Sequence, residues 1–283
     1  MSKESGVLYV VATPIGNLGD FTERARHVLA QVDLIAAEDT RHTGRLLAHY
    51  GIHAKLRSCH DHNEREQAEH LLDLVERGDD LALVSDAGTP LISDPGFTLV
   101  RAARERGLRV VPVPGANAAI CALSAAGMPS DRFLFLGFPP RTSAKRREWL
   151  AGVVDEPGTL IIYEAGNRVV ATLEDMGPVL GEDRCAMLAR ELTKRFETFL
   201  GGTLGSLAEL VRQDAEQQLG EIVILAEGRR ATSGSAQETE EERVLAVLSD
   251  ELPLKQAAAL AARITGGKKN RLYKLALERR NVG

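Results

Sequence analysis

The stretch that most constrains the fold is a short apolar run followed by a loop rich in glycine, proline and aspartate. Residues 81–84 (LALV) are all apolar, which is typical of a strand buried on both faces of a parallel sheet. Residues 85–96 (SDAGTPLISDPG) then hold two Asp, two Gly and two Pro. Ligands bind outside the carboxyl ends of such strands, and glycine lets a backbone approach a ligand closely. We therefore expect a ligand-binding loop here rather than an ordinary turn.

The rest of the N-terminal half alternates between strand and helix patterns. Up to Gly115 the expected order is β-α-β-α-β-α-β-α-β, which predicts a parallel sheet. Asp20 or Thr22 is expected to cap the first helix, and Asn63 the helix 64–77. Four strands of this order share a short apolar run and lie at residues 7–12, 33–37, 81–84 and 108–113.

Three further segments have the composition of binding loops. Residues 13–20 (TPIGNLGD) lack the Gly-x-Gly-x-x-Gly spacing, and no Gly-Lys-Ser/Thr follows, which excludes a dinucleotide fingerprint and a P-loop. Residues 38–43 (EDTRHT) carry both charge signs after the second strand, so they are expected to belong to a site. Residues 114–118 (PGANA) have small side chains, which leave exposed amides and room for a flat ligand.

A second α/β domain is expected from residue 132 onward. The segment 132–141 marks the crossing, and Gly, Ser, Thr and Ala dominate a linker at 229–239. Strands are expected at 159–164, 184–194 and 221–226, and helices at 167–180 and 207–214. Three helical segments near 240–249, 254–264 and 268–280 follow, with Gly266-Gly267 as a turn. The predicted domains are 1–131, 132–228 and a helix-turn-helix-like module at 240–283.

Charge is distributed unevenly along the chain. The formal net charge is −5, yet residues 253–283 hold eight Lys or Arg against one Glu. A basic module on an acidic body predicts a polyanionic partner, and a dimerisation or packing element is the alternative. No apolar run is long enough to cross a bilayer, and the N-terminus lacks a signal peptide's apolar segment. Three widely spaced cysteines suggest reduced thiols, so a cytoplasmic protein is expected.

All seven histidines fall between His27 and His70. The run Cys59–Glu64 could be taken for a metal cluster, but a structural zinc needs a second ligand pair at suitable spacing, and none is visible. No metal is therefore expected. His60 and His62 remain candidates for the edge of the site.

Five motifs together resemble one family, the tetrapyrrole-methylase-like superfamily of S-adenosylmethionine (SAM) methyltransferases. Within it, the set is similar to the ribosomal RNA small subunit methyltransferase I group. The motifs occur in order and are residues 12–20 (ATPIGNLGD), 37–43 (AEDTRHT), 85–96 (SDAGTPLISDPG), 114–116 (PGA) and 190–194 (RELTK).

The resemblance implies two α/β domains of the tetrapyrrole methylase type (class III), with SAM in the cleft between them, and a small helical module is expected at the C-terminus. It implies 2′-O-methylation of a cytidine ribose in the decoding region of 16S rRNA, and a homodimer. The cofactor residues that it implies are Pro14, Ser85, Asp86, Ala87, Asn117, Ala118, Tyr163, Glu221 and Ile222.

The chemistry would be an in-line transfer of methyl to oxygen, for which the protein mainly supplies alignment. A ribose hydroxyl is a poor nucleophile at neutral pH, so a base or cation would help, with Asp86 or Glu38 taking the proton. The expected acceptor-side residues are Glu38, Arg41, Asp86, Glu191 and Lys194. An interdomain salt-bridge network is the alternative role for these charges.

RNA recognition is expected from phosphate contacts and a splayed nucleotide. Aromatic residues make up only 4% of the chain, so the stacking candidates are few: Phe138, Tyr163 and Phe196. The expected RNA-binding residues are His60, His62, Lys268, Lys269, Arg271 and Lys274. Two alternatives remain: a tetrapyrrole methyltransferase, and a non-catalytic rRNA-binding assembly protein on the same fold.

Overall fold

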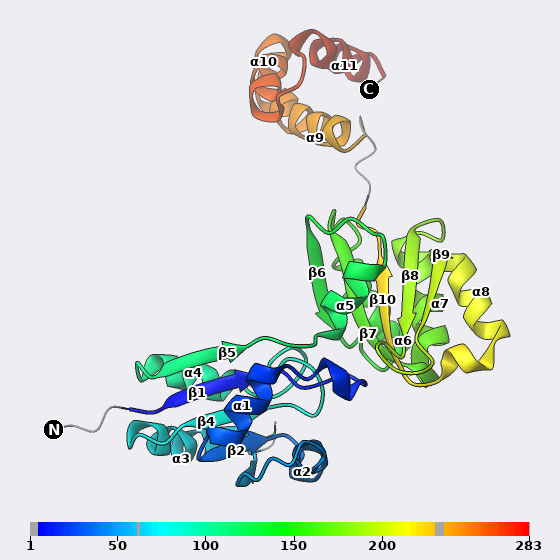
Figure 1. Ribbon diagram of the computed structural model, residues 1–283. Coiled ribbons are helices and arrows are strands. Elements are labelled where there is room, and N and C mark those ends of the chain that lie inside the picture. The colour runs from blue at the N-terminus through cyan, green and yellow to red at the C-terminus, as the bar shows by residue number, and fades with distance from the viewer. Residues whose placement is uncertain (1–4, 61–62, 230–234, 283) are drawn as a thin grey trace. The chain divides into compact units, whose positions relative to one another are not determined.

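The structure is a computed structural model that describes residues 5–60, 63–229 and 235–282 (Figure 1). The chain divides into two units, Met1–Gly228 and Arg229–Gly283. In the described residues, the larger unit contains two five-stranded sheets and the smaller unit contains helices.

The first sheet is entirely parallel, with the order β3-β2-β4-β1-β5. Its strands are β1 (Val7–Val11), β2 (Leu34–Ala37), β3 (Leu56–Ser58), β4 (Leu81–Val84) and β5 (Arg109–Val113). β4 lies at the centre and all its residues are buried, which confirms the prediction of a strand covered on both faces. Leu81 and Leu83 join the core on one face, and Ala82 and Val84 join the core on the other.

Helices cover both faces of this sheet (Figure 1). α3 (Glu64–Glu76) and α4 (Phe97–Glu105) pack on one face, and α1 (Glu23–Gln31) and α2 (Thr40–His49) pack on the other. The neighbouring strands β1 and β4 thus continue into helices on opposite faces. Such a pair of strands forms a topological switch point, and a ligand crevice is expected at their carboxyl ends.

The expected caps of two helices have different outcomes. Thr22 caps α1, because its side chain accepts a hydrogen bond from Ala25 N. Asn63 occupies the N-cap position of α3, as expected, but its side chain makes no capping hydrogen bond. The Asn63 side-chain oxygen instead accepts a hydrogen bond from His60 N at 2.8 Å, and its amide nitrogen donates to the carbonyl of Ser58 at 3.3 Å.

The second sheet is mixed, with the order β6-β7-β10-β8-β9. Its strands are β6 (Phe133–Gly137), β7 (Thr159–Ala165), β8 (Cys185–Arg190), β9 (Thr198–Thr203) and β10 (Glu221–Ala226). β6 and β7 are parallel, and the other neighbouring pairs are antiparallel. The last strand therefore lies in the middle of the sheet, between β7 and β8.

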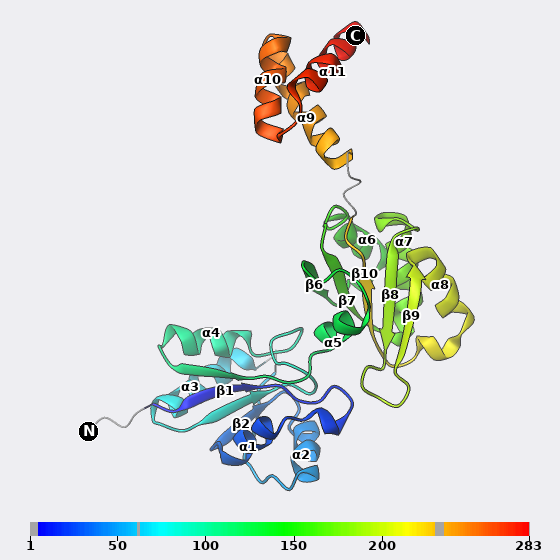
Figure 2. The same ribbon diagram turned by 45° about the horizontal axis from the view of Figure 1, so that its top comes forward.

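Helices also cover this sheet on two sides (Figure 2). α6 (Ser143–Ala151), α7 (Val169–Leu180) and α8 (Leu204–Gln213) contribute to the core on one face. α5 (Ala118–Ala125) packs on the other face, where Ile15 and Leu192 join the same cluster. Ile15 follows β1 and Leu192 follows β8, so this cluster ties the two halves of the larger unit together.

The smaller unit consists of α9 (Ser235–Glu251), α10 (Leu254–Thr265) and α11 (Lys269–Val282) among its described residues. α9 begins inside the segment expected to be a linker. Gly266 ends α10 in the left-handed region at φ 73°, which explains why glycine occurs at this turn. The core of the unit is formed by Leu245, Ala257, Ala258, Ala261, Leu272 and Ala276. Among the helices of the described ranges, none combines the length and apolarity needed to span a bilayer.

Candidate functional site

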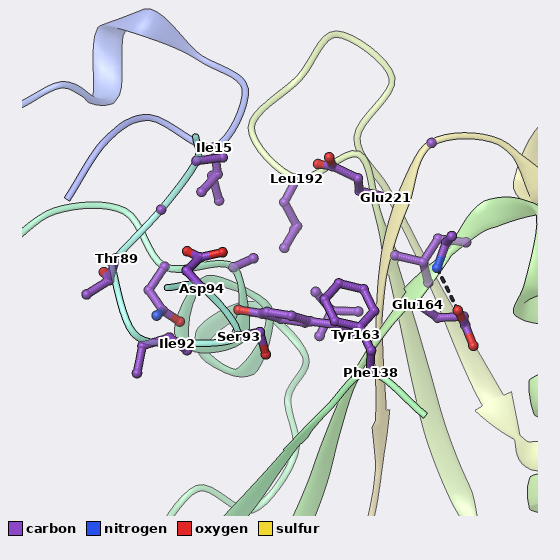
Figure 3. A pocket seen from close by; sticks show the side chains of 18 residues that line it. Ile15, Thr89, Ile92, Ser93, Asp94, Phe138, Tyr163, Glu164, Leu192 and Glu221 are labelled. Atoms are coloured by element: carbon purple, nitrogen blue, oxygen red, sulfur yellow. Dashed lines mark hydrogen bonds between the residues drawn. The ribbon is translucent and has the colours of Figure 1, made fainter. Parts of the chain in front are cut away.

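A pocket of about 380 Å³ lies where the loops after β1 and β4 face the second sheet (Figure 3). This volume falls within the range of small-molecule sites. Figure 3 shows the side chains of Ile15, Asp94 and Leu192 around the same space as the Tyr163 ring. The lining comes from both halves of the unit and comprises residues 15, 87–89, 92–94, 117–118, 138, 163–165, 192 and 220–223.

The structure brings together most of the residues expected to bind the cofactor. Those that line the pocket are Ala87, Asn117, Ala118, Tyr163, Glu221 and Ile222. Pro14, Ser85 and Asp86 lie outside its lining. The backbone next to them nevertheless shapes the pocket, because Thr13 Oγ1 donates to the carbonyl of Ser85 at 3.2 Å, and Thr13 and Gly88 exchange backbone hydrogen bonds of 2.8 and 3.1 Å.

The β4 loop is held in an uncommon backbone conformation. Leu91 and Ser93 have φ angles of 75° and 65°, a region that L-residues with side chains rarely occupy. Gly96 is at φ 125°, and a Cβ there would lie 2.6 Å from the Leu83 side chain, so only glycine fits. Strain of this kind persists where surrounding contacts enforce it and is frequent at ligand sites. Thr89 supplies one such contact, since its Oγ1 donates to the Ala116 carbonyl at 3.0 Å.

Two expected carboxylates meet at the carboxyl ends of β2 and β4. Asp86 N donates to a Glu38 carboxylate oxygen at 3.3 Å, and Asp39 N donates to Asp86 Oδ1 at 3.0 Å. Beside them, the Arg41 guanidinium bonds the Asp39 carboxylate at 2.8 Å and holds the pKa of Asp39 well below its usual range. The Arg41 side chain remains 83% exposed, so it is accessible to a ligand from solution.

The loop after β8 carries the other expected charged residues. Lys194 Nζ lies 2.8 Å from Glu191 and 3.1 Å from Glu221. Burial alone would lower the pKa of Lys194, but hydrogen bonds to both carboxylates outweigh it and raise that pKa above its ordinary value. Burial likewise opposes ionisation of Glu191, yet bonds from Lys194 and Glu221 N lower its pKa. Lys194 is therefore a protonated, ion-paired group at neutral pH and is unsuited to act as a base.

This β8 loop is also fitted closely to its neighbours. Glu191 and Thr193 have φ angles of 51° and 65°. A Cβ on Gly16 would lie 2.4 Å from the Lys194 stem, and a Cβ on Gly220 would lie 2.2 Å from the Glu191 carboxylate. Glycine at these two positions thus lets the loops after β1 and before β10 pack against the β8 loop.

An aromatic wall closes another side of the pocket. The Tyr163 ring makes edge contacts with Phe135, at 4.8 Å, and Phe138, at 5.6 Å between centroids. Its hydroxyl accepts a hydrogen bond from Ala119 N at 3.0 Å, in the first turn of α5. Burial, together with the nearby charge of Asp94, raises the pKa of Tyr163 to about 12. The phenol is therefore neutral and serves to position α5.

Sequence reasoning missed a buried carboxylate in the pocket wall. The Glu164 side chain is fully buried and accepts hydrogen bonds from Thr172 Oγ1, at 2.6 Å, and Ala165 N, at 2.8 Å, the latter drawn in Figure 3. Arg168 lies 3.3 Å from it and donates to the carbonyl of Pro139 at 2.9 Å. A Glu at the end of an otherwise apolar strand was the only available signal. The other lining residues that were not named as cofactor residues are Ile15, Gly88, Thr89, Ile92, Ser93, Asp94, Phe138, Ala165, Leu192, Gly220 and Val223.

The histidine region shows no metal-binding arrangement. Across the described ranges, no group of three or more His, Cys, Asp or Glu side chains could hold a metal ion. Cys59 is buried, and its burial next to Glu64 raises the pKa of the thiol to about 11, so it is protonated at neutral pH. His60 is partly buried, and His62 lies outside the described residues.

Comparison with known proteins identifies the chain. A family model described as "Tetrapyrrole (Corrin/Porphyrin) Methylases" matches residues 7–208, and one described as "RsmI C-terminal HTH domain" matches residues 235–280. The ribosomal RNA small subunit methyltransferase I of Escherichia coli O157:H7 is 57% identical over 96% of this chain and 95% of its own length. The chain belongs to this methyltransferase family. A relative of the same name from Pseudomonas aeruginosa is 55% identical, with 97% of this chain and 98% of that protein covered.

Solved structures agree on the fold alone. A uroporphyrin-III-C-methyltransferase from Thermus thermophilus superposes with a TM-score of 0.53 at 20% identity and covers 78% of this chain and 94% of its own. The methyltransferase CobJ gives 0.58 at 18% identity, covering 80% and 95%. A diphthine synthase gives 0.58 at 11% identity, covering 79% and 90%. At this identity, the family's different acceptors say nothing about the acceptor of this chain.

The C-terminal helix-turn-helix unit of this family member has an exposed basic face. Lys268, Lys269 and Lys274 are exposed at the turn and the start of α11. Arg271, which was expected to bind RNA, has a different contact, because its guanidinium pairs with Glu241 of α9, a carboxylate only 3% exposed. Arg271 thus holds α11 against α9 within the unit.

Proposed function

We propose that this chain transfers a methyl group from SAM to the ribose 2′-hydroxyl of a cytidine in the decoding region of 16S rRNA. The main support is the agreement between its relatives, named as small-subunit rRNA methyltransferases over nearly the whole chain, and the pocket at the switch point of its first sheet. The substrate is the small ribosomal subunit or its RNA, and the enzyme acts in the cytoplasm as a homodimer.

The pocket's chemistry fits SAM. A sulfonium is best surrounded by acceptors, and among the described lining residues the charged side chains are Asp94, Glu164 and Glu221, with no Lys or Arg. Ala87 and Ala118 leave space for a flat adenine, and Ile15 and Val223 add apolar walls. When bound, SAM supplies an activated methyl group, so alignment is the main task of the protein.

Glu38 and Asp86 are the groups that we assign to the acceptor hydroxyl. They follow adjacent strands, and each carboxylate accepts a backbone hydrogen bond at the same edge of the sheet, Glu38 from Asp86 N and Asp86 from Asp39 N. A carboxylate within hydrogen-bond reach of the 2′-hydroxyl would take its proton as the new bond forms. The exposed Arg41 would hold a neighbouring phosphate, since guanidinium pairs well with phosphate oxygens.

The remaining charged residues have supporting roles in this proposal. Lys194, Glu191 and Glu221 form an ion-pair cluster that fixes the β8 loop beside the pocket. His60 and His62 lie at the RNA-facing edge, and Lys268, Lys269 and Lys274 contact phosphates. The two α/β domains are assigned to residues 1–131 and 132–228, with the division between α5 and β6.

Transfer of labelled methyl from SAM tests the proposal. Purified protein is offered isolated small subunits, free 16S rRNA and a porphyrinogen, and the modified nucleotide is mapped. We expect label in the ribose of one cytidine and none in the porphyrinogen. Label in the porphyrinogen alone would favour a tetrapyrrole methyltransferase, and SAM binding without transfer to any acceptor would contradict the proposed activity.

Glu38→Gln tests the assigned base in the same assay. The amide keeps an acceptor for Asp86 N but cannot take a proton, so kcat should fall by about 10²- to 10⁴-fold while the SAM dissociation constant is unchanged. Glu105→Gln is the control, because Glu105 is an exposed α4 residue paired with Arg101. Activity of the Glu38 variant within a few-fold of wild type would remove Glu38 from the chemistry.

A further inference from the structure

Sequence-specific recognition of RNA targets mostly unpaired nucleotides whose bases are splayed out, and aromatic side chains are the usual platforms for such bases. Of the three aromatic candidates, Tyr163 is unavailable, because its ring contacts Phe135 and Phe138 and its hydroxyl bonds Ala119 N. Phe138 lines the cofactor pocket. The structure therefore directs attention to Phe196.

Phe196 is exposed although its loop is rigidly held. The side chain is 64% exposed, among the most exposed large apolar residues of the described chain. Around it, Thr193 N donates to a Glu197 carboxylate oxygen at 2.6 Å, and Glu197 N donates to the carbonyl of Lys194 at 3.2 Å. Thr193 also adopts the strained φ of 65°. A loop held in this way presents the ring with little conformational entropy left to lose on binding.

The neighbouring charge suits a nucleic acid. The Arg195 guanidinium lies 5.5 Å from the centre of the Phe196 ring, within the range of a cation–π contact. The ring provides a flat surface for a base, and the guanidinium over it provides a cation for the phosphate. A hydrophobic protein partner would gain less, because it would have to cover the guanidinium without neutralising it.

The position of the ring is also suitable. Leu192, in the same loop, lines the pocket, and the Lys194 stem packs against Gly16 of the β1 loop. Four residues of extended chain span at most about 14 Å, so Phe196 lies within that distance of the pocket wall. A nucleotide bound with its ribose at the methyl donor could therefore bring a base onto this ring.

We propose that Phe196, supported by Arg195, is the stacking platform for an unpaired base of the RNA substrate at or next to the methylated nucleotide. This inference rests on the proposed function. It assigns the tip of the β8 loop to RNA binding. The ion pairs of Lys194 with Glu191 and Glu221 hold the rest of that loop beside the pocket.

The test is steady-state methylation of small subunits by Phe196→Leu, with Phe196→Trp as the conservative variant. Leucine keeps an apolar side chain but has no ring, so KM for the subunits should rise about 5- to 150-fold, the effect of losing one stacked base. Tryptophan should restore the wild-type KM. The SAM dissociation constant, measured by calorimetry, should stay within about twofold, because stacking on an RNA base makes no contact with the donor.

Two matched variants separate stacking from charge. Phe133→Leu removes another exposed Phe, 42% accessible at the opposite end of β6 from the pocket, and should leave KM unchanged. Arg195→Ala should weaken binding and make the salt dependence of log K shallower by about 0.7 to 0.9, whereas Phe196→Leu should leave that slope as it is.

Three outcomes would overturn the inference. One is a Phe196→Leu protein with wild-type KM, and another is a loss of SAM affinity that accounts for its defect. The third is a fall in the molar mass measured by light scattering, which would assign the ring to a contact with a second copy of the chain. If the wild-type protein neither bound nor methylated subunits, the proposed function would fail as well, so the two failures are distinguishable.

Discussion

At the scale of single residues, a buried ion pair away from the pocket holds part of its rim in place. The Arg146 side chain, 4% exposed, pairs with Asp175, 5% exposed, and its guanidinium also donates to the carbonyl of Pro140 at 3.3 Å. Arg147 binds the same carboxylate at 2.6 Å from a side chain that is 51% exposed. Phe138 lines the pocket, and the ion-paired Arg146 holds the segment that follows it through this bond to Pro140.

We predict that Arg146→Ala lowers the free energy of unfolding by about 3–5 kcal/mol, because it leaves a buried carboxylate and carbonyl groups without their donor. Arg147→Ala is the matched control on the same helix. It removes a half-exposed partner of the same carboxylate and should cost at most about 1 kcal/mol. Urea unfolding followed by circular dichroism measures both, and equal losses would contradict the distinction.

The same pair predicts a dependence on pH. Burial opposes ionisation of Asp175, but hydrogen bonds from Arg147, Ser143 and Arg146 outweigh it, so its pKa lies below the ordinary value of 3.8. A carboxylate with a lowered folded-state pKa stabilises the protein at pH values above its ordinary pKa. This stabilisation is lost as the pH falls through the folded-state pKa. The Arg146→Ala deficit should therefore be complete at pH 7 and shrink below about pH 4, as the carboxylate becomes protonated in both proteins.

Residues that directly follow a strand could be placed from the sequence. Glu38 and Asp86 follow two strands that were expected in one parallel sheet, and Asp86 N donates a hydrogen bond to the Glu38 carboxylate there. Arg271 was assigned to RNA from charge alone, and the structure pairs it with Glu241. The partner of a long charged side chain depends on packing between helices distant in sequence, which composition does not encode.

At the scale of elements, α4 depends on a cap from another helix. Its N-cap is Gly96, which has no side chain to cap with. Glu64, at the start of α3 and 7% exposed, fills that role, since its carboxylate accepts a hydrogen bond from Leu99 N at 2.9 Å. A negative charge at this end also interacts favourably with the helix dipole. The β4 loop runs directly into α4, so this bond helps to fix the pocket.

Replacing Glu64 with Ala should lower the free energy of unfolding by about 1–3 kcal/mol, because Leu99 N is left buried without an acceptor. Glu64→Gln keeps an acceptor and should lose less. Glu66→Ala, an exposed position in the first turn of the same helix, should be nearly neutral. Thermal and urea unfolding check the order, and an effect of Glu66→Ala as large as that of Glu64→Ala would show that only local helix propensity matters.

Elements with a strong apolar period were predictable, and the others were not. β1, β2, β4 and β5 were expected from their apolar runs. β9 was missed because its sequence, TFLGGT, contains two glycines, and α6 was missed because its sequence, SAKRREWLA, is mostly polar. The central place of β10 depends on pairing with β7 and β8, a non-local choice that no local pattern reveals.

At the scale of the whole molecule, the site was only partly predictable because it is assembled from many segments. Motif loops such as residues 85–96 gave one side of the pocket. Phe138, Ala165 and Val223 complete it from segments outside the five motifs, and their place in the lining became visible only when both halves of the unit were folded together. The helical unit has a separate core of its own, so its contribution to function is expected to be separable from SAM binding.

That separability gives a final prediction. A protein ending at Gly228 retains every residue that lines the pocket. A solved structure of the same fold matches 78% of this chain with 94% of its own length, so the fold needs little beyond the two α/β sheets. It should therefore fold and bind SAM with a dissociation constant within about twofold of wild type, because ligand contacts are unchanged. Small-subunit binding should weaken, and its salt dependence should become shallower, because phosphate contacts from the helical unit are lost.

A full-length protein with Lys268, Lys269 and Lys274 replaced by Ala refines this test without deleting a unit. If each lysine neutralises one phosphate, the slope of log K against log salt should decrease by about 2–3. Arg243→Ala is the control, because that guanidinium is already paired with Glu240 on α9. Filter binding over a range of salt concentrations measures the slopes. A truncated protein that binds and methylates subunits with wild-type KM and slope would show that the helical unit serves packing or dimerisation, and the RNA contacts would then have to come from the two α/β domains alone.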